Sequence, residues 1–265
     1  MSPSLGLDHV YLRVHDPDAV LALFHLQLGL PVSWPLRDEP FARYAWVNAG
    51  NVQIELWQAR SDSDLPPATA LPLVAGLALW PSEVHASRDA LALQGVRCKE
   101  PRAWRTEGAG GDELNFTNCL VLDATGPACQ VFFCEWHPDA PIAPWPKGET
   151  TPCRRERLAK ELAGADNGGV GIEGLCAIHM QTPDVARSAR VWNAITGAVG
   201  IAAPGVALVL TPGHELEVTA LVMRVRDLPA ARARLEQQRL RTEHSDGVLW
   251  LDEKQAFGLR IGLAG

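Results

Sequence analysis

One face of a predicted strand near the N-terminus carries three side chains that could bind a ligand. Alternation along LDHVYLRV (residues 7–14) places His9, Tyr11 and Arg13 on one face and apolar residues on the other. An imidazole is a common ligand of divalent metal ions, and a guanidinium binds both oxygens of a carboxylate or phosphate. We therefore expect this strand to present a binding surface.

A second predicted strand, NVQIELW (residues 51–57), carries a matching set. Its alternation places Gln53, Glu55 and Trp57 on one face and aliphatic residues on the other. The aliphatic faces of both strands belong against helices, so the polar faces should line a common cup. Polar groups there would be partly desolvated and would need partners.

Three interpretations of this cup stay open. The His9 imidazole and the Glu55 carboxylate suit a divalent cation such as Zn, Fe, Mn or Ni. A hydrogen bond between them would need no metal, and a salt bridge from Arg13 to Glu55 would displace one. Trp57 could stack on a planar ligand or simply fill the core.

The elements that would position these residues follow a recognisable order. After the first strand, HDPD (15–18) signals the start of an amphipathic helix over 19–28. Three strand-like segments follow at 31–36, 43–48 and 51–57. Together they predict a β-α-β-β-β module.

This module recurs along the chain. The pattern V-x-D-x-x-A at residues 14–19 returns 211 positions later at 225–230. A third copy with shortened later strands begins at 175–181, and a weaker fourth begins at 74–80. One open module cannot bury its own sheet face, so we predict an α+β fold of four modules paired into two incompletely closed eight-stranded barrels.

The repeats divide the chain into three parts. Residues 1–140 would form an N-terminal domain of two modules with the candidate site, and 174–265 a C-terminal domain. The Pro-rich stretch with a short charged helix between them, 141–173, predicts a linker. The glycine-rich insertion at 106–113 predicts a solvated loop, with a lid as the alternative.

Composition limits the class of protein. The chain has 265 residues, 47% hydrophobic and 21% charged, and a net charge of −7, so it should be globular and unsuited to nucleic acid. Its longest apolar run, near 71–80, is about half of a membrane span, which takes roughly 20 residues. No signal peptide is visible and the six cysteines form no CxxC pair, so we expect reduced thiols, a cytoplasmic location and no membrane partner.

The motifs of the first module point to a family. The segment LDHV (7–10), the Asp-Pro helix start (16–17) and GNVQIEL (50–56) resemble the vicinal oxygen chelate superfamily. This superfamily includes glyoxalase I, fosfomycin and bleomycin resistance proteins, and extradiol ring-cleaving dioxygenases. The resemblance implies metal ligands on the first and fourth strands of a module, here His9 and Glu55. A less supported catalytic role for the Glu55 carboxylate is that of a base that moves a proton.

Other positions depart from the family pattern. A catalytic site typically keeps three protein ligands, yet the second module offers only Ala75 or Gly76 on its first strand and Phe132 on its fourth. Glu135 and His137 would have to complete the set from less favourable places. The corresponding C-terminal positions all lack a ligand: Leu175, Ala220 and Gly262.

These residues predict one of two functions, and both involve a small molecule as the partner. The first is a metal-dependent enzyme of the glyoxalase or dioxygenase type (a lyase, isomerase or dioxygenase) acting on a small oxygenated substrate in the N-terminal cup. The residues that would position the substrate are Tyr11, Arg13, Gln53 and Trp57. The alternative is a metal-free protein that sequesters a small molecule in a tryptophan-rich cup. In either case the C-terminal domain could be a scaffold or the surface of a homodimer.

Overall fold

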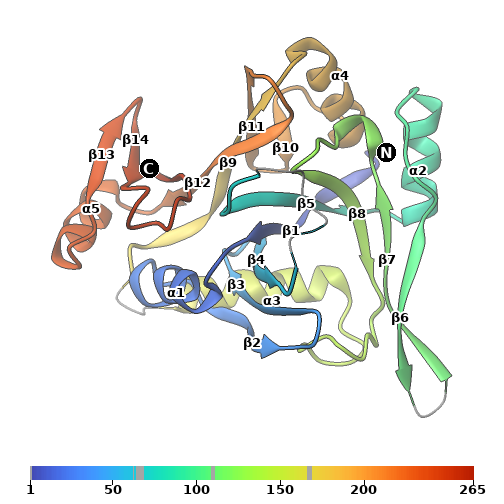
Figure 1. Cartoon of the computed structure of the whole chain (residues 1–265), viewed down its shortest axis with the longest axis horizontal. Helices are drawn as coiled ribbons and strands as arrows, with labels where there is room; N and C mark the ends of the chain where they lie inside the picture. The colour runs from blue at the N-terminus through green and yellow to red at the C-terminus, as the bar shows by residue number, and fades with distance from the viewer. Residues whose placement is uncertain (1, 62, 64–68, 109–110, 166–168) are drawn as a thin grey trace.

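The chain folds into two mixed β-sheets with helices packed around them (Figure 1). The computed structural model describes residues 2–61, 63, 69–108, 111–165 and 169–265. None of the helices in these ranges is both long and apolar enough to cross a membrane.

The first sheet contains eight strands built from two modules in the order β2-β3-β4-β1-β5-β8-β7-β6. The first module comprises β1 (Ser4–Arg13), α1 (Pro17–Ala22) with a π-helical turn (Leu23–Gln27), β2 (Val32–Asp38), β3 (Ala42–Asn48) and β4 (Gln53–Ala59). The second comprises β5 (Leu73–Pro81), α2 (Val84–Leu93), β6 (Arg102–Gly108), β7 (Gly111–Leu120), a 3₁₀ turn (Leu122–Ala124) and β8 (Gln130–Trp136). Strands β1 and β5 pair antiparallel at the centre, which joins the modules as the repeats predict.

The recurring aspartate of the repeat caps a helix in each module that carries it. The Asp16 carboxylate accepts hydrogen bonds from the backbone N–H groups of Asp18 and Ala19, and Pro17 occupies the first turn. Asp227 accepts from the N–H of Ala230 at the start of the last helix in the same way. The pattern read from the sequence is therefore a helix N-terminus.

The second sheet contains seven strands in the order β10-β11-β9-β12-β15-β14-β13. It follows α3 (Thr151–Gly164) and comprises β9 (Ile172–Thr182), α4 (Val185–Thr196), β10 (Ile201–Ala203), β11 (Val206–Pro212), β12 (Glu217–Val225), α5 (Leu228–Gln237), β13 (Thr242–Ser245), β14 (Val248–Leu251) and β15 (Ile261–Ala264).

The α+β fold of paired modules is confirmed, with one strand fewer than the predicted eight in this second sheet. In the first module, residues 28–59 hold three strands after the helix. In the third module, the shorter segment 197–212 holds only two, and β10 is a three-residue edge strand. The chain between α4 and β12 is too short for a further strand.

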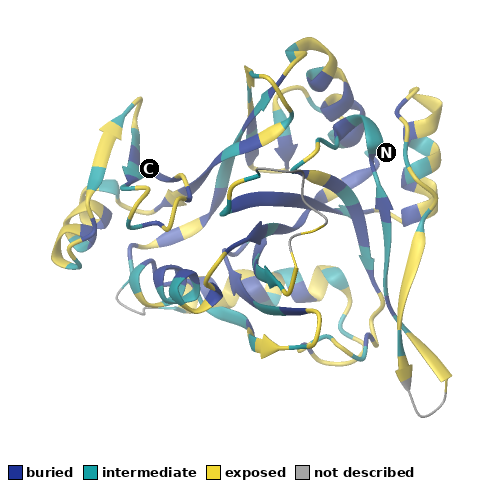
Figure 2. Cartoon of the chain, in the orientation of Figure 1, coloured by how far each residue is buried: buried dark blue, intermediate teal, exposed yellow. Residues whose placement is uncertain are grey.

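Two clusters of buried side chains hold the fold together. The larger is continuous through both sheets and the helices between them, and buried strands run through the centre of Figure 2. The smaller lies on the inner face of the eight-stranded sheet and is rich in indole rings. Its buried members are Trp34, Trp46, Ala78, Cys134, Trp136, Ala140 and Trp145.

Candidate functional site

The register of β1 and β4 brings the six predicted site residues together on the inner face of the first sheet. The strands pair in parallel, with His9 beside Gln53, Tyr11 beside Glu55, and Arg13 beside Trp57. Pairs in register share a face of a sheet.

A β-bulge adds a residue that the sequence pattern does not reveal. Leu7 pairs with Leu79 and His9 with Ala78, so Asp8 is an extra residue in the ladder. Strict alternation places Asp8 on the opposite face from His9. With the bulge, its carboxylate lies 2.8 Å from the Nδ1 atom of His9.

The buried Asp8 carboxylate makes hydrogen bonds through both of its oxygens. Its Oδ1 accepts a hydrogen bond from Arg154 Nη2 at 2.8 Å, and its Oδ2 accepts one from Trp136 Nε1 at 3.0 Å. Burial alone would raise the pKa of Asp8, but the Arg154 cation and the hydrogen bond from His9 hold this pKa well below its usual range. Asp8 is therefore an ionised acceptor, which assigns the shared proton to His9 Nδ1.

The other ring nitrogen of His9 faces Glu55. His9 Nε2 lies 3.7 Å from Glu55 Oε2, which is too long for a hydrogen bond. Burial raises the pKa of the Glu55 carboxyl, while His9 and the Trp46 indole oppose part of this rise. The carboxyl is only 13% exposed, so its charge is poorly solvated.

We expect Glu55→Gln to stabilise the metal-free protein at alkaline pH. The raised pKa means that folding favours the protonated carboxyl, so the Glu55 contribution to stability is complete below the unfolded pKa and is lost as pH rises through the folded pKa. Urea unfolding between pH 4.5 and 8, in chelator-treated protein, should show a stability gain that grows with pH. A gain that is the same at every pH would contradict this prediction.

Aromatic rings fill much of the inner face around His9. The centroid of the His9 ring lies 4.6 Å from that of Trp46 and 5.9 Å from that of Phe132. Trp46 in turn contacts Trp34 at 5.3 Å and Trp136 at 6.1 Å between centroids. This end of the predicted cup is a packed cluster rather than an open cavity.

The accessible part of the inner face is an aromatic rim beyond Glu55. Tyr44 and Trp57 stack with their centroids 5.4 Å apart, and Tyr11 meets Trp57 edge-on at 5.9 Å. Phe41, which is 59% exposed, packs against both Tyr44 and Trp57. A planar molecule could extend this stack next to Glu55.

Arg13 is buried beside this rim. It is 3% exposed, and its Nη2 donates a hydrogen bond to the backbone oxygen of Ser61 at 3.3 Å. The site therefore contains a guanidinium whose position is fixed by the chain that follows β4.

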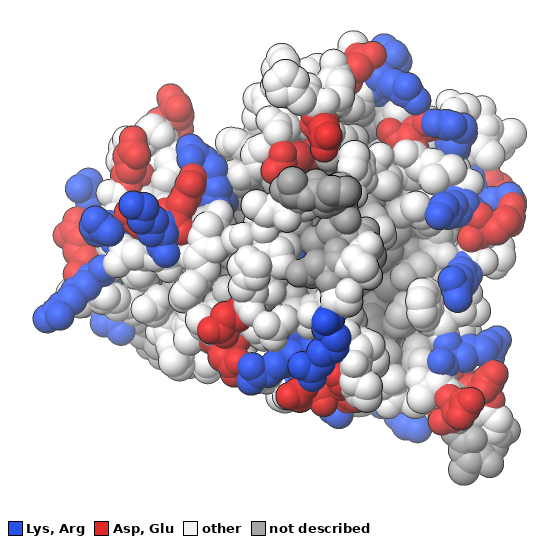
Figure 3. All heavy atoms as spheres, viewed as in Figure 1, with Lys and Arg blue, Asp and Glu red and all other residues white. Residues whose placement is uncertain are grey.

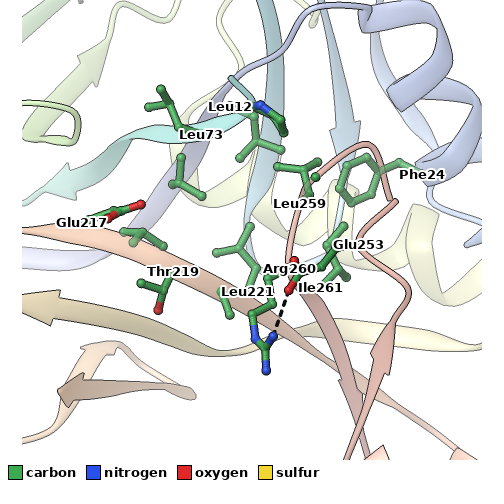
Figure 4. Close-up of a pocket in the computed structure, with 15 residues that line it drawn as sticks. Leu12, Phe24, Leu73, Glu217, Thr219, Leu221, Glu253, Leu259, Arg260 and Ile261 are labelled. Atoms are coloured by element: carbon green, nitrogen blue, oxygen red, sulfur yellow. Dashed lines mark hydrogen bonds and ion pairs between the residues drawn. The ribbon is translucent and has the colours of Figure 1, made fainter. Parts of the chain in front are cut away.

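A separate cavity of about 240 Å³ lies between the two halves of the chain. Figure 4 shows Leu12, Leu73 and Leu259 converging on it, while Arg260 donates to Glu253 at 2.9 Å. None of the predicted site residues lines this cavity. Charged side chains of both signs lie around the edge of the face shown in Figure 3.

Comparison with known proteins agrees with this topology. Residues 8–116 match the model of the glyoxalase/bleomycin resistance protein/dioxygenase superfamily. This segment, which is less than half of the chain, is therefore similar to that superfamily. The resemblance seen in the first module is thus confirmed. No curated protein has significant sequence similarity to the chain.

Similarity to solved structures extends over nearly the whole chain. The Mn(II)-bound glyoxalase from Novosphingobium aromaticivorans has a TM-score of 0.59 at 14% identity, covering 99% of this chain and 82% of its own. Homoprotocatechuate 2,3-dioxygenase from Arthrobacter globiformis has a TM-score of 0.58 at 15% identity, covering 99% and 80%. A mutant 4-hydroxymandelate synthase from Streptomyces coelicolor has a TM-score of 0.57 at 14% identity, covering 99% and 92%.

The resemblance to this superfamily implies a metal ion, and His9 and Glu55 are the two residues that would hold one. The position of His9 Nε2 opposite Glu55 suits a shared cation. Among the described residues no three His, Cys, Asp or Glu side chains are grouped to hold a metal. The site therefore fits a cation with two protein ligands, in contrast to the usual three.

The residues considered as further ligands lie elsewhere. The Glu135 carboxyl lies near Glu83, Val84 and His85 at the start of α2, away from the inner face. His137 is exposed, and its Nδ1 accepts from the backbone N–H of Asp139. Neither can complete the set with His9 in this arrangement.

The remaining positions named from the sequence carry no ligand. In the second module, Gly76 lies against Tyr11, and Phe132 contacts His9. Leu175 and Ala220 are buried apolar residues, and the ring of Trp250 packs closely over Gly262.

Proposed function

We propose that the N-terminal domain is a metal-assisted enzyme of the glyoxalase or dioxygenase type acting on a small oxygenated molecule. The observation that carries this proposal is the alignment of Asp8, His9 and Glu55, with 3.7 Å between His9 Nε2 and Glu55 Oε2. Two metal–ligand bonds of about 2.1 Å each can span that gap. A substrate would approach this pair from the aromatic rim beyond Glu55, where Tyr44 stacks on Trp57.

A bound cation would act as a Lewis acid that polarises the substrate oxygens. The chain's own residues would prepare the site for it. Asp8 holds the proton on His9 Nδ1 and so keeps Nε2 free to bind. Glu55, whose pKa is raised by burial, is suited to give or accept a proton. Tyr11 and Trp57 would position a planar substrate.

A second candidate is metal-free binding of an aromatic molecule. The observation in its favour is that the described residues offer no third ligand, while the rim stacks Tyr44 on Trp57. In this case Glu55 and Arg13 would supply polar contacts without chemistry.

Metal content separates the two candidates. Protein purified without an affinity tag or chelator, then incubated with Zn, Fe, Mn or Ni, should retain about one equivalent of metal by plasma mass spectrometry. His9→Ala should abolish retention, and Asp8→Asn should weaken it about 10–100-fold because the imidazole loses its orienting partner. The matched control is Glu135→Gln, because Glu135 lies away from the inner face, and this variant should retain metal as the wild type does.

The opposite result would favour the second candidate. If the wild type retains none of these metals, the metal-assisted proposal fails. Quenching of tryptophan fluorescence by aromatic compounds, with loss of the effect in Trp57→Ala, would then test metal-free binding.

A further inference from the structure

A second cavity, of about 210 Å³, lies where the segment after β8 covers the first sheet. It is lined by Ser33 and Gln53 from the sheet, and by Pro144, Trp145, Pro146, Arg154, Arg157 and Leu158 from the covering segment. Its volume is well above that needed for a single water molecule.

The sheet side of the cavity presents a buried hydroxyl without a partner among the described residues. Val32 pairs with Val47 and Trp34 with Trp46, so Ser33 is an extra residue at a register shift in β2. Its hydroxyl is buried and makes no hydrogen bond to any described residue.

Gln53 places an amide on the same side of the cavity, and the residue is only 3% exposed. A buried polar group left unsatisfied costs about 1–3 kcal/mol. The Ser33 hydroxyl, which has no partner among the described residues, therefore points to a missing acceptor or donor in the cavity.

The covering segment adds a second unsatisfied group, which is a donor. Trp145 is 9% exposed, and its indole Nε1–H has no acceptor within the described part of the chain. An indole can only donate, so its partner must supply an acceptor atom. The neighbouring wall is apolar, formed by Pro144, Pro146 and Leu158.

Positive charge lies beside these donors. The Arg154 guanidinium lines the cavity, lies 4.3 Å from the centroid of the Trp145 ring and donates from Nη2 to Asp8. Arg157 lines the cavity while it is held by both oxygens of Glu149, at 2.8 and 2.9 Å. No acidic side chain lines the cavity.

We propose that this cavity binds a short-chain monocarboxylate. The carboxylate oxygens would accept from Ser33, Trp145, Gln53 and Arg154, and the short alkyl chain would lie against the two prolines and Leu158. The cavity adjoins the site proposed for a cation, because Gln53 pairs with His9 and Arg154 with Asp8. Glu55 does not line it, and a carboxylate bound there would need no metal.

Titration of the ¹⁵N-labelled full chain with propionate tests the proposal. The Trp145 indole N–H signal, identified by its loss in Trp145→Phe, should shift and saturate at millimolar propionate. Propionamide and n-propylammonium have similar shape but lack the anion, so each should shift it at least tenfold less at equal concentration.

Variants then locate the effect. Ser33→Ala and Gln53→Leu should each weaken propionate binding at least tenfold, with amide spectra that report an intact fold. Gln94→Leu, on the exposed end of α2, is the matched control and should bind as the wild type does. Glu55→Gln should also keep the response, which separates this site from the cation site.

The wild-type titration alone can overturn the proposal. A linear, non-saturating shift would mean that propionate does not bind in the cavity. Equal shifts with propionate and propionamide would mean that the cavity does not select a carboxylate, which also overturns the proposal. Loss of the response in Glu55→Gln would instead assign the anion to the other site.

Discussion

Replacing Arg154 by methionine should lower the free energy of unfolding by about 3–5 kcal/mol. Arg154 is 2% exposed and pairs with Asp8, whose side chain is 3% exposed, so the variant leaves a buried carboxylate without its cation. Methionine keeps much of the volume, so the loss reports on charge rather than on packing. Urea unfolding of the whole chain at pH 7 measures it.

The matched control is Arg232→Met. Arg232 forms an exposed pair with Glu236 on α5, and such pairs contribute about 0–1 kcal/mol. If both variants lose the same stability, the buried pair does not have the role assigned to it.

The pH dependence of Arg154→Met gives a second measure. The depressed pKa of Asp8 means that its pair adds stability above the unfolded pKa, and that this stability is lost as pH falls towards the folded pKa. Without Arg154, burial raises the Asp8 pKa, so the deficit of the variant should shrink on acidification. The double variant with Asp8→Asn should recover part of the loss at pH 7.

Trp34→Ala should cost about 3–5 kcal/mol, as large-to-small changes at buried aromatic residues do. Trp34 is 2% exposed, and its ring lies 5.3 Å from that of Trp46 and 5.7 Å from that of Trp145. The substitution opens a cavity that rigid strands on both sides cannot close. Guanidinium unfolding followed by circular dichroism measures the loss.

Trp104→Ala provides the comparison because Trp104 is 45% exposed on β6. Its loss should stay below about 1 kcal/mol, as is usual for surface substitutions. A small effect at Trp34 would show that the inner face adapts around the gap and that the cup is open in solution.

The sequence predicts those features that depend on local pattern. Alternation is enough to place His9 beside Gln53 and Tyr11 beside Glu55 on one face, because both strands are regular after residue 9. The repeated aspartate predicts helix starts because the cap is a contact within one turn.

The missed features depend on breaks in regularity and on distant contacts. The register shifts at Asp8 and Ser33 change which face each side chain takes, and no residue type in either strand announces the shift. The partner of Asp8, Arg154, lies 146 positions away in a helix that reads as charged. The residues that this helix buries, Arg154, Leu158 and Leu162, are spaced by four. The sequence does not reveal this buried face because an arginine occupies its first position.

The filled cup was also beyond local pattern. The sequence contains nine tryptophans, but it does not show which of them meet. Only the fold brings Trp34 and Trp46 against Trp136 and Trp145. Whether an indole lines a cavity or fills it depends on the segment that covers the sheet.

The core that runs through both sheets explains why a half with few candidate ligands can persist. Leu7 and Leu79 of the first half belong to the same buried cluster as Leu175 and Leu263 of the second. A chain that lost its second half would expose that shared surface and fold poorly, whatever its chemistry. The second half can thus contribute to the function of the first through stability alone, whatever side chains its own sheet presents.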